Sequence, residues 1–598
     1  MFKKRNWVVI MIAGILFTTA ASGQNLEDEW NDFLHYTKIG RLDLAKGYAQ
    51  AVLQREPDPV KLLELSEKNP AGYAILVKVS ETAADTELTE LTKKILEVIE
   101  TGKFIRRADP KTIVQEVNRL MVSNARGKLL AVERLQNAGE YAIMYMLDAM
   151  QETTDEDELS NLIWGLSQIG RSSVRPLVSA LQTNDIAIKA EIIKALGKIA
   201  YPQALAYLKY IVESDNSDEL RSLATESIKQ IDPAAINVSA AQLFFRLAEN
   251  YYYHIQSLAP AEDADFANIW FWDTEKNRLY REEVDKKYFH ELMAMRSCEW
   301  ALKADPQFAT AIGLWQASFF KAESAGKQMP KYFGAAHPKA SVYATTIGPE
   351  YLHQALARAV RDNNAYVALG VIEALATTAG EKSLLYRIGT VQPLVQALTF
   401  DDKAVRYSAA IAIAAAGPTE NFAESSLVTK NLAEALAHNA RNITEKTNDW
   451  NGELADSYAL RSAQVMLKLA ETKNQVIDLS LAGNILIDAT KDSRPEIQVL
   501  AGRILARLKS PEAQRSIAKM ALEETNDMTV RITAFDSLAI SAKFNARLLE
   551  NESIDAIYAL VSSRQINPEL RTAAAAAFGA LNLPSDKVKN LILDQGRT

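Results

Sequence analysis

Residues 402–417, DKAVRYSAAIAIAAAG, combine an acid, a base four residues later and a run of small apolar side chains. Asp402 is a residue type that caps helix N-termini, because its carboxylate accepts hydrogen bonds from N–H groups left without partners in the first turn. Arg406 lies on the same helical face and can pair with an acid at the cap position of its own helix or of a neighbouring one. The apolar side chains that follow recur at the helical period. The stretch predicts a helix on which another helix packs closely.

The same arrangement occurs at several other places in the chain. Strict copies begin at Asp185, Asp527 and Asn567, and looser copies at Asn124, Asp155 and Ser217. The starts at 124, 155, 185 and 217 lie 30 to 32 residues apart, with segments such as VRPLVSALQ (174–182) between them. A fixed period in this range is typical of a solenoid of helix pairs. A small residue twelve positions after a start, such as Gly197 or Gly579, predicts the close approach of a neighbouring helix.

These features resemble the HEAT repeat. The D-x-x-x-[RK] helices have trailing alanines, and P-L-V-x-A-L helices precede two of them, at 176–181 and 393–398. The short spacing resembles the bacterial form of the repeat that also occurs in phycobilisome lyases. The resemblance implies an all-α fold, an α-solenoid of stacked antiparallel helix pairs, and partner binding as its general use.

Two further segments resemble tetratricopeptide helices. In the N-terminal segment the residues near that family's positions are Trp30, Leu34, Gly40, Ala45 and Pro57. In the aromatic-rich middle, A-L-x-x-D-P at 301–306 closes one helix before the next begins, although the W-x-x-L-G-x-x-Y start of that family is missing. Breaks rich in loop-forming residues are predicted at 324–348 and 438–457. The predicted organisation is a signal peptide (1–23), tetratricopeptide-like helices (24–103), HEAT-like repeats (104–235), a middle module (236–346) and two more HEAT-like blocks (347–440 and 456–598).

A small β-hairpin is predicted inside the middle module. Residues 269–272 and 278–284 are rich in strand-forming side chains, and DTEKN between them is a plausible turn. An insertion that interrupts stacked helices has no repeat-packing reason to exist, so its aromatic side chains are candidates for contact with a peptide or a glycan. The other interpretation is that these aromatic side chains fill the core. The candidate partner-binding residues are Trp270, Trp272, Tyr280 and Arg281.

The N-terminus has the layout of a secretory signal. Lys3, Lys4 and Arg5 precede the apolar stretch 7–17, and small residues lie before Gln24. The apolar stretch is short against the roughly 20 residues that span a bilayer, so no stable membrane insertion of the mature chain is expected. The alternative is an uncleaved N-terminal anchor.

Cleavage would remove three positive charges and take the net charge from −8 to about −11, which disfavours binding to nucleic acid. Cys298 is the only cysteine, so the chain cannot form an internal disulfide. For an exported chain, this favours the bacterial periplasm as its location.

The sequence has no catalytic signature. Its six histidines form no HExxH pair or zinc-spaced cluster, and it has no GxSxG, GxxxxGK[ST] or GxGxxG motif. Cys298 lies between apolar neighbours and is predicted to be a buried structural thiol. No catalytic residue, metal or cofactor is predicted.

The function predicted is an exported, non-enzymatic scaffold or adaptor that binds another envelope protein or a peptide. The alternative is an enzyme or small-ligand carrier of the phycobilin-lyase type on the same repeat fold.

Overall fold

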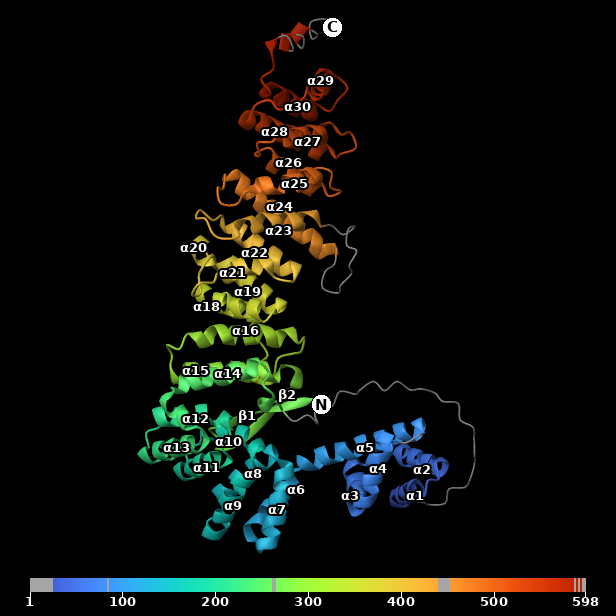
Figure 1. The fold of residues 1–598 in the computed structure, drawn as a ribbon, viewed down its shortest axis with the longest axis vertical. Coiled ribbons are helices and arrows are strands. Elements are labelled where there is room, and N and C mark those ends of the chain that lie inside the picture. Colours follow the sequence, from blue (N-terminus) through green and yellow to red (C-terminus); the bar gives the residue numbers. More distant parts are fainter. Residues whose placement is uncertain are drawn as a thin grey trace. The chain divides into compact units, whose positions relative to one another are not determined.

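The computed structural model describes residues 25–82, 85–260, 265–438, 452–585, 588–589 and 592–593. The signal sequence predicted at 1–23 therefore lies outside the described residues. The chain forms two compact units. The first contains residues 1–204, 217–232 and 270–281, and the second contains 205–216, 233–269 and 282–598. Both units are built of α-helices that pack in pairs (Figure 1), as the sequence predicts.

The first unit begins with helices that share a core of their own. These are α1 (Leu26–Lys38), α2 (Leu42–Gln54), α3 (Pro59–Lys68), α4 (Pro70–Thr82) and α5 (Thr86–Arg107). Trp30, Leu34 and Ala45, which the tetratricopeptide resemblance singled out, are all buried in this core. Gly40 adopts a φ of +74° between α1 and α2, a left-handed conformation that suits glycine.

The remaining helices of the first unit carry the predicted repeats. They are α6 (Pro110–Val122), α7 (Ala125–Ala138), α8 (Glu140–Glu152), α9 (Glu156–Gln168), α10 (Val174–Ala180), α11 (Ile186–Ile199) and α13 (Asp218–Ile231). Each predicted start is the N-cap of its helix, because its side chain accepts a hydrogen bond from a first-turn N–H. The four caps are Asn124, Asp155, Asp185 and Ser217.

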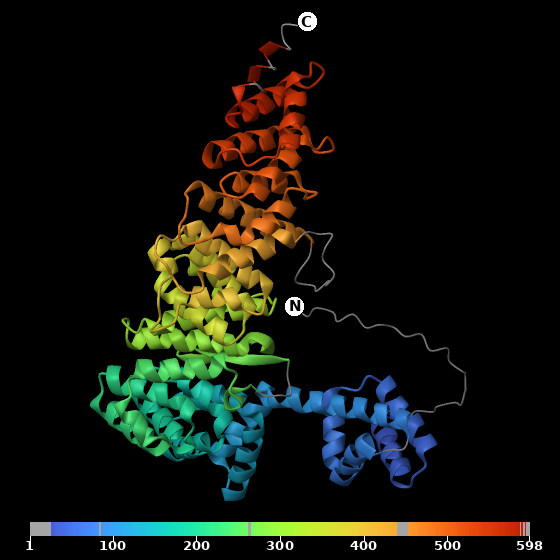
Figure 2. The same cartoon turned by 45° about the horizontal axis from the view of Figure 1, so that its top comes forward.

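The second unit contains the middle module and the C-terminal repeats. Its first elements are α12 (Leu205–Ser214), α14 (Ala240–Tyr252), parts of β1 (Phe266–Asp273) and β2 (Arg278–Asp285), α15 (Phe289–Ala304), α16 (Thr310–Ser324) and α17 (Ala340–Ala344). The helices that follow are α18 (Pro349–Arg361), α19 (Ala365–Thr378), α20 (Glu381–Leu384), α21 (Pro393–Gln396), α22 (Lys403–Ala416) and α23 (Ser425–Ala437). The last ones are α24 (Gly452–Glu471), α25 (Gly483–Ala489), α26 (Pro495–Leu505), α27 (Pro511–Leu522), α28 (Met528–Asn545), α29 (Asn551–Ser562) and α30 (Pro568–Ala580). Figure 2 shows the helices from α18 onward stacked in chain order.

Both predicted breaks are shorter than expected. Residues 439–451 lie outside the described residues, but α24 already begins at Gly452, so the last part of the break predicted at 438–457 is helical. The break predicted at 324–348 contains the short helix α17. In both places the helix uses apolar residues such as Ala340 and Ala455, which are fully buried. Loop-like composition alone therefore overstated the length of each break.

The opening stretch forms α22, with one correction to the predicted pairing. Asp402 caps the helix by accepting a hydrogen bond from the Val405 N–H at 3.1 Å. Arg406 does not pair with a cap acid. Its guanidinium lies 3.1 Å from the Glu434 carboxylate on α23 and also donates to the Asn431 side chain and to the carbonyls of residues 400 and 401. In this repeat, Arg406 thus ties α22 to the next helix and to the preceding loop.

The small residue twelve positions after a start permits close packing at Gly197. A Cβ atom built on Gly197 of α11 would lie 2.6 Å from Ser227 Oγ on α13, closer than real Cβ contacts. For Gly579 the prediction stays untested, because no described atom outside its own helix lies within 4 Å of a Cβ built there and part of the chain after α30 lies outside the described residues.

Gly197→Ala and Gly579→Ala form a matched pair that tests this packing. We expect Gly197→Ala to lower the free energy of unfolding by about 1–3 kcal/mol, because α13 must move away from the new methyl group. Gly579→Ala gains the helix propensity of alanine, up to about 1 kcal/mol, with no steric cost. Urea unfolding followed by circular dichroism measures both. Equal effects of the two changes would contradict the contact between α11 and α13.

Candidate functional site

The predicted hairpin is present, and its strands are longer than expected. β1 and β2 form a two-stranded sheet joined by residues 274–277. Asp273 closes the turn by accepting hydrogen bonds from the N–H groups of Glu275 and Lys276, each at 3.0 Å. Asn277 takes a φ of +50°, which asparagine tolerates better than most residues. Local turn chemistry therefore sets where the hairpin reverses.

Two of the four candidate residues anchor the hairpin on the repeat helices of the first unit. The Trp270 side chain is 3% exposed, and its indole N–H donates to Glu140 on α8 at 2.8 Å. The Ser179 hydroxyl of α10 donates to the Trp270 carbonyl at 3.0 Å. Trp272 is 8% exposed. Both tryptophans fill buried space, and the polar atom of Trp270 is satisfied inside it.

Polar contacts hold the tip of the hairpin to α8. Arg278 forms an ion pair with Asp148 at 2.8 Å. The side-chain amide of Asn277 donates to Gln151, and the Gln151 amide donates back to the Asn277 carbonyl. These contacts come from one face of α8, because residues 148 and 151 are one turn apart. The hairpin tip is thus fixed on the repeats.

The other two candidate residues lie nearer to solvent. The Tyr280 side chain is 45% exposed, and its ring stacks on Phe271 with centroids 5.2 Å apart. The Arg281 guanidinium is partly buried and lies 4.8 Å from the centre of the Tyr141 ring, a cation–π distance. The structure therefore divides the four candidates into a buried pair and a more accessible pair, with Tyr280 the most exposed.

The middle module also contains a buried polar cluster that the sequence did not indicate. Glu291 of α15 is 3% exposed, and its Oε1 atom lies 2.6 Å from His254 Nε2 and 3.2 Å from Lys321 Nζ of α16. Lys321 also donates to the carbonyl of Tyr252 at 2.8 Å. Burial alone would raise the pKa of Glu291, but the hydrogen bond with His254 and the charge of Lys321 outweigh it and hold the pKa below its ordinary value.

Other features bear on chemistry and on membranes. Cys298 is fully buried, as predicted, and burial raises the pKa of its thiol well above the ordinary value. Among the described residues, no three or more His, Cys, Asp or Glu side chains gather as a metal site. Within that same part of the chain, no helix has both the length and the apolar character needed to cross a membrane.

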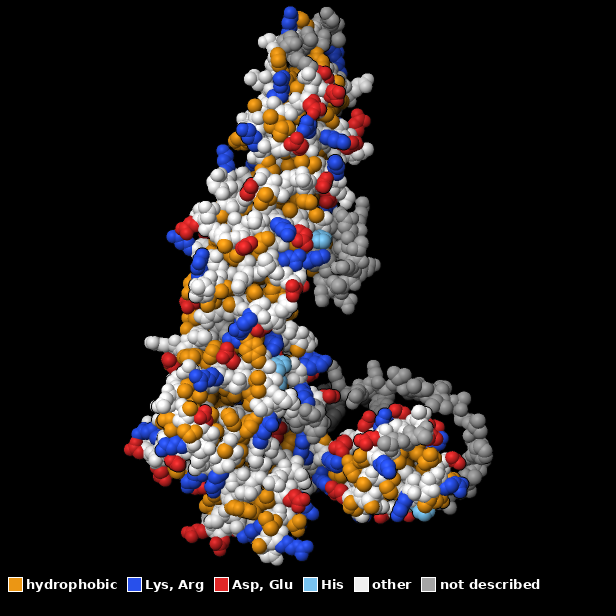
Figure 3. Space-filling view, in the orientation of Figure 1, with side chains coloured by type: hydrophobic (Ala, Val, Ile, Leu, Met, Phe, Trp, Pro, Cys, Tyr) orange, Lys and Arg blue, Asp and Glu red, His pale blue; other side chains and the backbone are white. Residues whose placement is uncertain are grey.

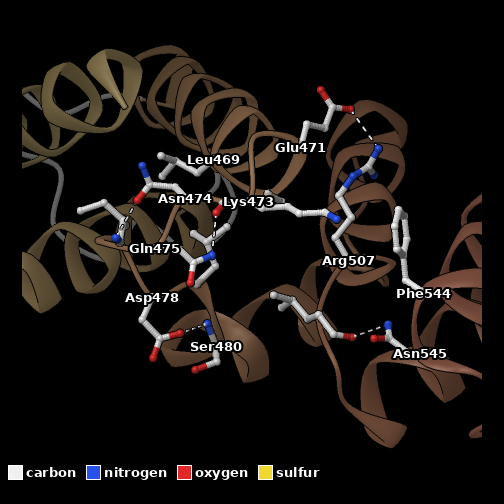
Figure 4. A pocket seen from close by; sticks show the side chains of 14 residues that line it. Leu469, Glu471, Lys473, Asn474, Gln475, Asp478, Ser480, Arg507, Phe544 and Asn545 are labelled. Atoms are coloured by element: carbon white, nitrogen blue, oxygen red, sulfur yellow. Dashed lines mark hydrogen bonds and ion pairs between the residues drawn. The ribbon is translucent and has the colours of Figure 1, made fainter. Parts of the chain in front are cut away.

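A surface cavity of about 490 Å³ lies in the C-terminal repeats of the second unit (Figure 4). It is bordered by the segment after α24, by the residues after α26 and by the end of α28. On the face of the molecule that Figure 3 presents, hydrophobic side chains are mixed with charges of both signs. No signal in the sequence could have located this cavity, because its walls come from three separate repeats. Its lining includes Lys473, Asn474, Asp478, Arg507, Phe544 and Asn545.

Comparison with known proteins identifies the repeats. The sequence model of the family described as HEAT repeats matches residues 143–229. No curated protein sequence matches the chain.

Several solved structures resemble the chain at low identity. The karyopherin Kap121p bound to the extreme C-terminus of the protein phosphatase Cdc14p is 13% identical, with 92% of this chain and 60% of that chain covered and a TM-score of 0.25. This chain thus spans about 60% of the length of that karyopherin. Importin beta in an ammonium sulfate condition is 12% identical, with coverages of 95% and 70% and a TM-score of 0.26. She4p is 12% identical, with coverages of 95% and 88% and a TM-score of 0.28.

The buried cluster yields a prediction about stability and pH. Since the pKa of Glu291 is lower in the folded chain, its carboxylate stabilises the fold above the unfolded-state pKa of about 4.3, and this stabilisation is lost as the pH falls through the folded pKa. We expect Glu291→Gln to lower the free energy of unfolding by about 2–3 kcal/mol at pH 7. Urea unfolding at several pH values measures this difference.

The control is Glu373→Gln, at an exposed position of α19. We expect this variant to change the free energy of unfolding little. If Glu291→Gln lowers the free energy of unfolding as much at pH 3 as at pH 7, the carboxylate charge does not stabilise the cluster.

Proposed function

We propose that this chain is a non-enzymatic scaffold that binds another protein or a peptide on the surface of its stacked helices, of which residues 143–229 match the HEAT-repeat family. Repeats of this kind present long, continuous surfaces built from neighbouring helices, and partner binding is their general use. The hairpin is the observation that carries the proposal for this chain. It interrupts the repeats, is fixed to them by Trp270 and Arg278, and still holds an aromatic side chain, Tyr280, in solvent.

In this proposal the four candidate residues have different roles. Trp270 and Trp272 are buried and position the hairpin, whereas Tyr280 and Arg281 contact the partner. Tyrosine and arginine are among the side chains that most often carry interface energy. Tyr280 is held in place by its stack on Phe271, and Arg281 by the Tyr141 ring. Little side-chain freedom would therefore be lost when a partner binds.

The proposal places the scaffold in the bacterial envelope. The support is the N-terminal sequence: a basic start, a short apolar stretch and small residues before Gln24. An envelope protein or a peptide in the periplasm would then be the partner. The net charge of −8 argues against nucleic acid as the partner.

Partner capture tests the role of the hairpin. The mature chain, carrying an affinity tag, is used to capture proteins from the envelope of its native host, side by side with the variant Tyr280→Ser/Arg281→Ser. We expect the double variant to lose a partner that wild type captures, by about tenfold or more, since two interface anchors are removed. The matched control is Tyr366→Ser, at an exposed tyrosine of α19 that is 49% exposed.

Circular dichroism of all three proteins shows whether folding is preserved. Undiminished capture by the folded double variant would place the site elsewhere on the repeats. Capture of no specific protein by wild type would contradict the scaffold proposal itself.

Export is tested on protein expressed in its native host. We expect the intact mass to correspond to a chain that starts at or close to Gln24, because signal peptidases cut after small residues that follow the apolar stretch. Fractionation of the same cells shows where this form resides. Recovery of the full-length chain in the cytoplasm would contradict export.

A further inference from the structure

The cavity in the C-terminal repeats is formed where three successive repeat helices end. Lys473 follows α24, Arg507 follows α26, and Phe544 lies in the last turn of α28. In Figure 4 the Lys473 side chain extends toward Arg507 and Phe544. Its ammonium lies 5.1 Å from the centre of the Phe544 ring. The Phe544 side chain is 58% exposed, so two cations and an accessible aromatic ring border the same space.

The acids of the cavity are already engaged. Glu471 is shared by Arg503 at 3.1 Å and Arg507 at 3.3 Å. Asp478 accepts a hydrogen bond from the N–H of Ser480 at 2.9 Å. One carboxylate thus serves two guanidinium groups, and within the described residues Lys473 forms no ion pair. Within the lining, Glu471 and Asp478 balance Lys473 and Arg507 in number, and Lys473 is left without an ion pair to a described residue.

Three further cations stand next to lining residues in the chain. Lys509, Lys543 and Arg547 are exposed and lie within two residues of lining residues. None of the three makes an ion pair with another residue that the structure describes. The nearby acids Glu512 and Glu550 both pair with Arg515. A local cluster of uncompensated cations stands out in a chain whose net charge is −8.

Lys473 holds a backbone conformation that a lysine rarely adopts. Its φ is +53°, and the N–H groups of Lys473 and Asn474 donate to the carbonyls of Ala470 and Leu469. This is the hydrogen-bond pattern that ends many helices with a left-handed residue, usually glycine. Glycine adopts this conformation without strain, so replacing Lys473 by glycine removes the ammonium and keeps the helix end intact.

We propose that this cavity binds an acidic segment of the partner protein, with a carboxylate between Lys473 and Arg507 and an adjacent apolar side chain on Phe544. The inference rests on the proposed scaffold function and adds the chemistry of the partner. A cavity of about 490 Å³ accommodates a few side chains of an extended segment. The ammonium of Lys473 attracts the carboxylate, and the exposed ring removes apolar surface of the partner from water.

Purified full-length mature chain and synthetic probes test the proposal. The probes are two fluorescein-labelled decapeptides, one alternating Glu and Phe and the other alternating Lys and Phe, and binding is followed by fluorescence anisotropy. We expect the acidic peptide to bind at least about tenfold more tightly than the basic one at 50 mM salt, and this difference to shrink at 300 mM salt as charges are screened.

Lys473→Gly separates binding from folding. We expect about a fivefold loss of affinity for the acidic peptide, as for one charge pair at a surface, together with an unchanged or higher melting temperature, because glycine suits the left-handed backbone. Phe544→Ser is expected to weaken binding to a similar extent, and Lys473→Arg to retain it. Lys491→Ala, an exposed lysine outside the cavity lining, is the matched control and leaves affinity unchanged.

Several results would overturn the proposal. The first is equal affinity for the two peptides, and the second is full affinity for the acidic peptide in folded Lys473→Gly. The third is that a single-stranded DNA dodecamer binds more tightly than the acidic peptide and that its binding also depends on Lys473. The Tyr280→Ser/Arg281→Ser variant binds the acidic peptide normally if the cavity acts as proposed. Peptide binding by wild type without capture of any envelope protein would contradict the scaffold function and leave the cavity's chemistry supported, so the two failures are distinguishable.

Discussion

Close packing between capped helices is the constraint on which the rest of the structure depends. Several repeat helices start at a side chain that satisfies first-turn N–H groups, as Asp402 and Asp185 do. Each must then accept a neighbour along its apolar face, which is why Gly197 can stand against Ser227. With its termini satisfied and its face covered, one helix pair becomes the platform for the next. A chain without disulfides relies on this packing for its stability.

Polar side chains connect neighbouring helices of the stack. Arg406 connects α22 to α23 and to the preceding loop, and its several hydrogen bonds fix the spacing of these segments. Glu291 performs a similar task in the middle module, where it joins α15 to α16 and to His254. Buried charges of this kind are costly unless they are paired, so the loss of one partner leaves the others uncompensated.

The hairpin and the C-terminal cavity are two places where the stack presents aromatic rings beside charged side chains. The hairpin is an insertion, and the burial of Trp270 secures it on the repeats while Tyr280 stays in solvent. The cavity needs no insertion, because it forms where the ends of α24, α26 and α28 meet. At its edge Lys473 stands in a backbone conformation better suited to glycine. Both features combine aromatic rings with cations, the side chains that suit an interface with a peptide or a protein.

The sequence by itself determined the features that depend on local chemistry. Helix starts follow from cap residues, the repeat from its period, and the hairpin from strand-forming residues around a turn that Asp273 closes. Tertiary structure decided which side chains meet. The partner of Arg406 is Glu434 instead of a cap acid, Gly197 stands against Ser227, and Trp270 is buried where Tyr280 is exposed. Lys473, Arg507 and Phe544 are more than 30 residues apart in the chain. They border one cavity only because stacking brings the ends of successive helices together, and no local pattern encodes that distance.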